Sequence, residues 1–165
     1  MIRGNAVIGQ SGGPTSVINA SLAGVIQECM KRTEVENVYG MRFGIEGFMQ
    51  ENLIDLEAED SASIEALRST PSSALGSCRH KLQDSDLEII MRVIEKYSIR
   101  YFFLIGGNDT MDTINRVEDY CRQKGYELLG VGIPKTVDND LFGTDHTPGY
   151  GSAARYVALS VKQSG

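Results

Sequence analysis

The chain repeats one local pattern, in which a short apolar run leads through a glycine turn into residues with helical spacing. Residues 6–9 precede Gly12-Gly13 and residues 101–105 precede Gly106-Gly107, and after each turn apolar side chains recur three and four positions apart. A third apolar run, residues 127–133, ends in a polar loop that leads to a further glycine-rich helix start. This alternation predicts a doubly wound α/β fold, with a mostly parallel sheet and helices on both faces. All three turns are expected at one edge of the sheet, because the carboxyl ends of parallel strands meet there.

Smaller elements are predicted between these units. Residues 35–42 have the pattern of a second strand, and the glycines in residues 43–48 indicate a loop. Residues 52–68 alternate acidic and apolar side chains, which predicts a short strand and a short helix with a solvated face. The sequence Ser85-Asp86-Leu87-Glu88 has the form of a capping box and predicts a helix that begins there.

Length and composition restrict the class of protein. The 165 residues suffice for one ordinary domain, and 41% hydrophobic with 23% charged residues is typical of a soluble globular chain. Apolar runs stay well short of the roughly 20 residues that span a bilayer, and the start does not resemble a signal peptide. We therefore expect a cytoplasmic protein without membrane contact. The net charge of −6 argues against nucleic-acid binding, which needs clustered Lys and Arg.

Cysteine and histidine do not indicate a metal or disulfide framework. The three cysteines are odd in number and widely spaced, which predicts small core residues, and the two histidines are too few for a metal site.

The polar loop after residue 133 concentrates reactive side chains. Pro134 ends the strand because proline has no N–H to give to a sheet. One ammonium, one hydroxyl and three carboxylates then follow, namely Lys135, Thr136, Asp138, Asp140 and Asp145. In an extended turn Asp138 and Asp140 would point to opposite sides, one toward a substrate hydroxyl and the other toward a cation or a buried donor. The alternative is a solvated acidic loop without a ligand.

Two further segments could bind an anion. The turn at Gly12-Gly13 places backbone N–H groups and a helix start together, although it matches neither the dinucleotide fingerprint nor the Walker P-loop. A tight turn without a ligand is the alternative. The small-residue loop 70–81 ends in Arg79, His80 and Lys81, and the arginine and lysine suggest an anion clamp or, alternatively, a surface pair of charges. Amides, cations and carboxylates at one edge are the groups that phosphoryl transfer needs.

Four of these segments resemble, in order, the motifs of the phosphofructokinases: Ser11-Gly12-Gly13, Gly76-Ser77-Cys78-Arg79, Gly106-Gly107-Asn108-Asp109-Thr110 and Pro134 to Asp140. The resemblance spans nearly the whole chain. It implies that Asp138 is the catalytic base, which takes the proton from the 1-hydroxyl of fructose 6-phosphate. It also implies sugar binding at Thr136 and Val137, a second acid at Asp140, and donor-phosphate contacts at Gly13 and Arg79.

Two positions indicate the phosphoryl donor. The ATP-dependent branch of the family usually has glycine at the place of Asp109 and a small residue at the place of Lys135, whereas the pyrophosphate-dependent branch resembles this sequence at both. A carboxylate at Asp109 would put bulk and negative charge where the ATP α-phosphate lies. Lys135 would supply a cation for the transferring group. The resemblance thus implies reversible transfer from pyrophosphate to fructose 6-phosphate, in glycolysis or gluconeogenesis. An ATP-dependent enzyme and a non-catalytic phosphate-binding fragment are the alternatives.

The resemblance further implies Mg²⁺ and a longer protein. Asn108 stands where the family often has a metal-associated aspartate, so it is the candidate Mg²⁺ ligand. A neutral amide binds Mg²⁺ less strongly than a carboxylate, and the alternative is that pyrophosphate itself holds most of the ion. The family's remaining sugar contacts and its second domain lie beyond residue 165. We therefore expect residues 1–165 to be the donor-binding and catalytic domain of a truncated chain, inactive alone and homo-oligomeric in the complete protein.

Overall fold

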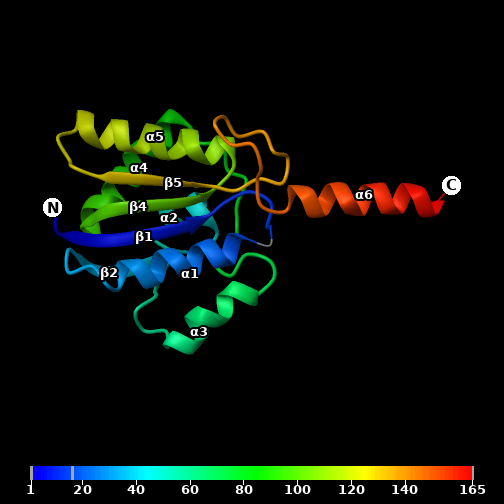
Figure 1. Cartoon of the computed structure of the whole chain (residues 1–165). Helices are drawn as coiled ribbons and strands as arrows, with labels where there is room; N and C mark the ends of the chain where they lie inside the picture. Colours follow the sequence, from blue (N-terminus) through cyan, green and yellow to red (C-terminus); the bar gives the residue numbers. More distant parts are fainter. Residues whose placement is uncertain (1, 16, 165) are drawn as a thin grey trace.

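β1 (Gly4–Gln10) is the central strand of the sheet and is buried along all seven of its residues. In the computed structural model, which describes residues 2–15 and 17–164, the strand order is β3-β2-β1-β4-β5. The other strands are β2 (Val35–Met41), β3 (Leu53–Asp55), β4 (Ile99–Gly106) and β5 (Leu129–Pro134). All neighbours pair in parallel except β2 and β3. The mostly parallel sheet is therefore confirmed (Figure 1).

Helices cover both faces of this sheet, because alternate residues of β1 point to opposite sides. Ala6 and Ile8 pack in one apolar cluster with α1, and Val7 packs in the other with α2, α4 and α5. The helices are α1 (Ile18–Cys29), α2 (Gly44–Met49), α3 (Ser61–Ala66), α4 (Asp84–Lys96), α5 (Asn108–Gln123) and α6 (Tyr150–Ser164), with a short 3₁₀ turn at Leu67–Ser69. The predicted doubly wound fold is confirmed.

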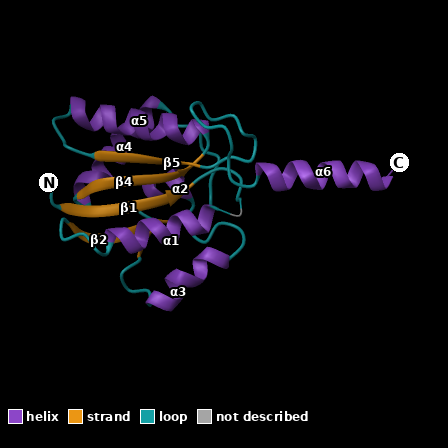
Figure 2. Cartoon of the chain, viewed as in Figure 1, coloured by secondary structure: helices purple, strands orange, loops and turns teal. Residues whose placement is uncertain are grey.

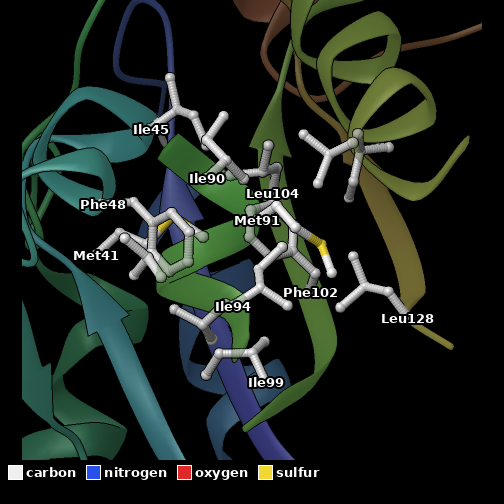
Figure 3. Packing of buried hydrophobic residues seen from close by; sticks show 14 of the residues in the cluster. Met41, Ile45, Phe48, Ile90, Met91, Ile94, Ile99, Phe102, Leu104 and Leu128 are labelled. Carbon is white, nitrogen blue, oxygen red and sulfur yellow. The ribbon is translucent and has the colours of Figure 1, made fainter. Parts of the chain in front are cut away.

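The core on the α4 side shows how tightly the layers pack (Figure 3). Phe48 of α2 meets Phe102 of β4 edge to face, with ring centroids 5.4 Å apart and planes at 87°. Ile90 and Ile94 of α4, almost fully buried, belong to the same cluster. Cys121 lies there too, and the three cysteines are free and buried, as predicted.

Two predictions of local structure were wrong. Residues 43–48 form no loop, since α2 begins at Gly44, directly after the left-handed Phe43 at φ 59°, and Gly44 itself has a φ of 61°. Helix α4 begins at Asp84, earlier than the predicted capping box, because Gln83 is extended and its N–H donates to Asp86 Oδ2 at 2.8 Å. The predicted box paired Ser85 with Glu88, whereas the structure pairs Gln83 with Asp86, two residues earlier.

Strand register brings the loops of interest to one place. The chain runs from β1 through α1 to β2 on one side, whereas β4 and β5 lie on the other, so the strand order reverses between β1 and β4. Gln10 pairs with Ile105, and Gly106 pairs with Pro134. The segments after β1, β4 and β5 therefore start side by side at the carboxyl edge, where ligands bind in open α/β sheets (Figure 2).

Helix α6 differs from the other helices because it extends away from the sheet (Figure 1). None of its described residues is buried, and Tyr156, Val157 and Val161 are among its exposed apolar side chains. Across the described residues, no helix combines the length and the apolar character that crossing a bilayer requires.

A buried polar network fastens the segment before Arg79 to the sheet. Asn19 of α1 accepts hydrogen bonds on Oδ1 from Gln10 Nε2 and from the Ala74 N–H, both at 2.9 Å, and its Nδ2 donates to the Thr70 carbonyl at 2.9 Å. Gln10 Oε1 accepts in turn from the Leu75 N–H at 2.9 Å. The network thereby holds residues 70–75 in place, shortly before the predicted anion clamp.

We expect Asn19→Ala to lower the free energy of unfolding by about 1–3 kcal/mol, because it removes a buried hydrogen bond to Gln10 and two part-buried bonds to the backbone. Urea unfolding measures the change. Asn115→Ala is the matched control, since Asn115 is an exposed asparagine on helix α5, and surface changes stay within about 0.5 kcal/mol. Equal losses in both variants would contradict a structural role for the network.

Candidate active site

A cleft of about 620 Å³ opens at the carboxyl ends of β1, β4 and β5. Its walls come from the four segments that carry the motifs, which lie up to 129 positions apart between Ser11 and Asp140. All predicted site residues line it: Gly13, Arg79, Asn108, Asp109, Lys135, Thr136, Val137, Asp138 and Asp140. The structure thus brings together every residue that the sequence proposed, in a space large enough for a small anion and its acceptor.

The first glycine turn is held against the loop that carries Arg79. Gly12 is left-handed at φ 74°, its N–H donates to the Cys78 carbonyl at 3.2 Å, and its carbonyl accepts from Ser77 Oγ at 2.6 Å. A methyl group added to Gly13 would lie 3.9 Å from an Arg79 guanidinium nitrogen. The two predicted donor-phosphate contacts are therefore neighbours, with backbone and guanidinium facing one volume.

The second glycine turn joins β4 to α5 with almost no connecting residues. β4 ends at Gly106 and α5 begins at Asn108. A Cβ on Gly106 would stand 2.2 Å from Thr110 Oγ1, so only glycine permits this close approach. The tight join places Asp109, in the first turn of α5, in the cleft wall with its side chain exposed.

Lys135 is a buried cation at the floor of the cleft. Only 5% of the residue is exposed. Its N–H donates to the Gly106 carbonyl at 2.8 Å, and its ammonium donates to the Gly13 carbonyl, so it links two of the glycine turns. Burial, and then the charge of Arg79, lower the pKa of Lys135, while Asp138 acts in the opposite direction. Two cations thus face the same space, which favours an anion between them.

The turn that holds the two aspartates is bent. Asn139 is left-handed at φ 59°, and the Asp138 N–H donates to Thr136 Oγ1 at 3.1 Å. Asp138 and Asp140 both line the cleft. The extended turn that the prediction of opposite sides assumed is absent, because Asn139 is left-handed.

Asn139 is a positioning residue that the sequence reasoning missed. Its Nδ2 donates to the Asp145 carbonyl at 3.2 Å, and its Oδ1 accepts from the Thr147 N–H at 2.8 Å. These bonds brace the loop behind Asp138. The available signal was the residue type, since asparagine is among the few residues that adopt a left-handed conformation readily.

The cleft does not form a metal cage from protein groups alone. Asn108 Nδ2 donates to Asp140 Oδ2 at 3.0 Å, so the amide orients one carboxylate oxygen. Over residues 2–15 and 17–164, no group of three or more acidic, histidine or cysteine side chains could hold a metal ion. Magnesium commonly binds through one or two carboxylates together with substrate phosphates. The cleft fits an ion of that kind, shared with a ligand.

Comparison with known proteins gives a consistent picture. A family model described as Phosphofructokinase matches residues 5–164. The pyrophosphate–fructose 6-phosphate 1-phosphotransferase of Rhodospirillum rubrum is 46% identical over 158 residues, which cover 96% of this chain and 39% of that protein. The crystal structure of the pyrophosphate-dependent phosphofructokinase from Nitrosospira multiformis superposes with a TM-score of 0.89 at 45% identity, over 97% of this chain and 40% of the other.

A sulfofructose kinase of Alkalicoccus urumqiensis is 38% identical over 157 residues, covering 95% of this chain and 40% of that protein. The chain therefore spans about two fifths of the length of these relatives.

We expect Lys135→Met to weaken pyrophosphate binding by about 10- to 100-fold, the range for losing a contact to a charged group. The same change should raise the free energy of unfolding at pH 7, because burial disfavours the ammonium in the folded state. That gain should shrink as pH rises from the lowered folded-state pKa toward the ordinary value of 10.5, above which the lysine is neutral in both states.

Titration calorimetry and urea unfolding at several pH values measure both effects. Lys124→Met, which changes an exposed lysine that follows α5, is the control. A Lys135→Met chain that is less stable at pH 7 would show that the bond to Gly13 outweighs the cost of burial.

Proposed function

This chain belongs to the phosphofructokinase family, and from that premise we propose that it carries the donor site and the base of an enzyme for phosphoryl transfer from pyrophosphate to the 1-hydroxyl of fructose 6-phosphate. The observation that carries the proposal is the single cleft in which Lys135, Arg79 and two glycine turns meet Asp138. The names of the relatives at 45–46% identity support both substrates. Since the relatives are longer, the activity belongs to a longer enzyme.

Phosphoryl transfer needs groups that position and neutralise an anion, and one base for the acceptor. Lys135 and Arg79, with the amide of Gly13, would hold the pyrophosphate oxygens and stabilise the phosphate that leaves. Asp138 would accept the proton of the sugar hydroxyl as the new bond to phosphorus forms. The reaction would be reversible because the two phosphoryl donors, pyrophosphate and the sugar bisphosphate, are close in energy, and the same groups serve both directions.

Asp109 supports pyrophosphate rather than ATP as the donor. It lies in the first turn of α5, exposed and in the wall of the cleft. A nucleotide that placed its terminal phosphates near Lys135 would bring its inner phosphate toward this carboxylate, and like charges repel. Pyrophosphate has no inner phosphate and avoids the conflict.

Magnesium is part of the proposal as an ion that enters with pyrophosphate. Asn108, through its amide oxygen, and Asp140 would hold it from the protein side. When bound, it would neutralise charge on the transferring phosphoryl group. We also propose, on the resemblance alone, that the longer enzyme is a homo-oligomer of the cytoplasm.

The donor is tested by calorimetric titration of this chain with pyrophosphate and with ATP, both in the presence of Mg²⁺. We expect pyrophosphate to bind and ATP to be excluded, and Asp109→Gly to increase ATP affinity by at least about tenfold, the scale of removing one charge conflict. Asp112→Gly makes the same change at an exposed site of α5 outside the cleft and should have no such effect. Tighter binding of ATP by the unaltered chain would restore the ATP-dependent alternative.

The base is tested by Asp138→Asn in the longer enzyme that carries this segment. We expect turnover to fall by about 10²- to 10⁴-fold, the contribution of a positioned base, while pyrophosphate affinity changes little. Asp145→Asn is the control, because Asp145 is exposed in the same loop and lies outside the cleft. Turnover above a tenth of the original would remove Asp138 from this role.

The sugar substrate is tested by parallel assays with fructose 6-phosphate and sulfofructose, the two sugars for which the relatives are named.

A further inference from the structure

His80 lies in the wall of the cleft directly after Arg79, and the proposed reaction does not use it. Its Nε2 is 2.8 Å from Asp86 Oδ2, and the two side chains are only 27% and 14% exposed. Asp86 Oδ2 also accepts the N–H of Gln83 at 2.8 Å, at the start of α4. The pair therefore has a fixed place, set by the first turn of a helix.

Asp86 is held in its charged form. The hydrogen bond from His80, followed by that from the Gln83 N–H, lowers the pKa of the Asp86 carboxyl. A carboxylate at this distance orients the imidazole. The structure thus holds an oriented imidazole on the wall of an anion cleft.

The second ring nitrogen is available for a ligand. Nε2 is engaged with Asp86, and within residues 2–15 and 17–164 no hydrogen bond involves Nδ1. The ring also borders a small cavity beneath the cleft, whose other lining residues are Ser11, Ile45, Leu104, Asp109, Thr110 and Thr113. A protonated imidazole carries a proton on both nitrogens, so Nδ1 becomes a donor when Asp86 holds Nε2.

Charged groups surround the ring on several sides. Asp86 faces it from α4, and Asp109, at the start of α5, lines the same small cavity. Arg79 and Lys81 flank it on its own loop and line the cleft with it. Arg116 of α5 acts on Asp86 from further away while its guanidinium binds Asp84 at 2.7 Å. Two carboxylates and two cations therefore lie around the ring, and the two cations line the cleft where an anion can bind.

We propose that His80 is a pyrophosphate-binding residue, whose ring is held by Asp86 and donates its Nδ1–H to the anion. The inference rests on the proposed function for the identity of that anion. It adds a pH-dependent contact to the site, beside the contacts of the arginine and lysine cations, Arg79 and Lys135. Pyrophosphate affinity should then carry a contribution that is present when the ring is protonated and lost when it is neutral.

The test compares dissociation constants for pyrophosphate between His80→Gln and the unaltered chain, at pH values from 6 to 8.5 and constant Mg²⁺. Glutamine can still donate to Asp86 but cannot titrate. The ratio of the two constants cancels the titration of pyrophosphate itself. We expect a ratio of about ten at pH 6, the scale of one charged hydrogen bond, which falls toward one at pH 8.5.

His146→Gln is the matched control, since the second histidine is exposed and lies outside the cleft lining. Its ratio should stay near one at every pH. Thermal melting of each variant confirms that the fold is retained. A ratio for His80→Gln that is near one, or that does not change with pH, overturns the inference. Binding of pyrophosphate by the unaltered chain in the same experiment still supports the proposed function. If the unaltered chain binds no pyrophosphate at any pH, the donor site and this inference both fail.

Discussion

The register of three parallel strands is the constraint on which the site depends. Gln10 pairs with Ile105, and Gly106 pairs with Pro134, so the chain leaves all three strands at one edge. The backbone continues this alignment beyond the strands, with the Ser11 N–H donating to the Ile105 carbonyl at 2.9 Å and the Lys135 N–H donating to the Gly106 carbonyl at 2.8 Å. A slip of one residue would turn each following side chain to the other face of the sheet.

Buried polar groups then convert this alignment into a fixed geometry. The Gln10–Asn19 pair holds the segment before Arg79, and the Lys135 ammonium bridges to Gly13. Such groups cost free energy to desolvate and are tolerated only when their hydrogen bonds are made. Lys135 is the extreme case, because burial lowers its pKa while a second cation lies nearby. A lysine in that position is poorly explained by stability and well explained by an anionic ligand.

The balance of charge in the cleft suits a small, highly charged donor. Cations come from the loop before α4 and from the loop after β5, and carboxylates come from the start of α5 and the turn around Asn139. An anion can bind between the cations while the carboxylates remain at the rim for a base and for ion binding. Helix α6, with its exposed apolar side chains, lines no part of this cleft.

The sequence alone determined the architecture and the membership of the site. Apolar runs of strand length, glycine turns and helical periodicity are local signals, and parallel strands necessarily bring their carboxyl ends together. For that reason the residues from Gly13 to Asp140 could be named in advance. Only the tertiary structure decided how they are oriented. The left-handed turn at Asn139 lies between the two aspartates, and both line one cleft. Asn108 forms a hydrogen bond with Asp140, and His80 forms one with Asp86, six residues away. Those outcomes depend on backbone angles and on contacts between separate segments, which periodicity and composition do not encode.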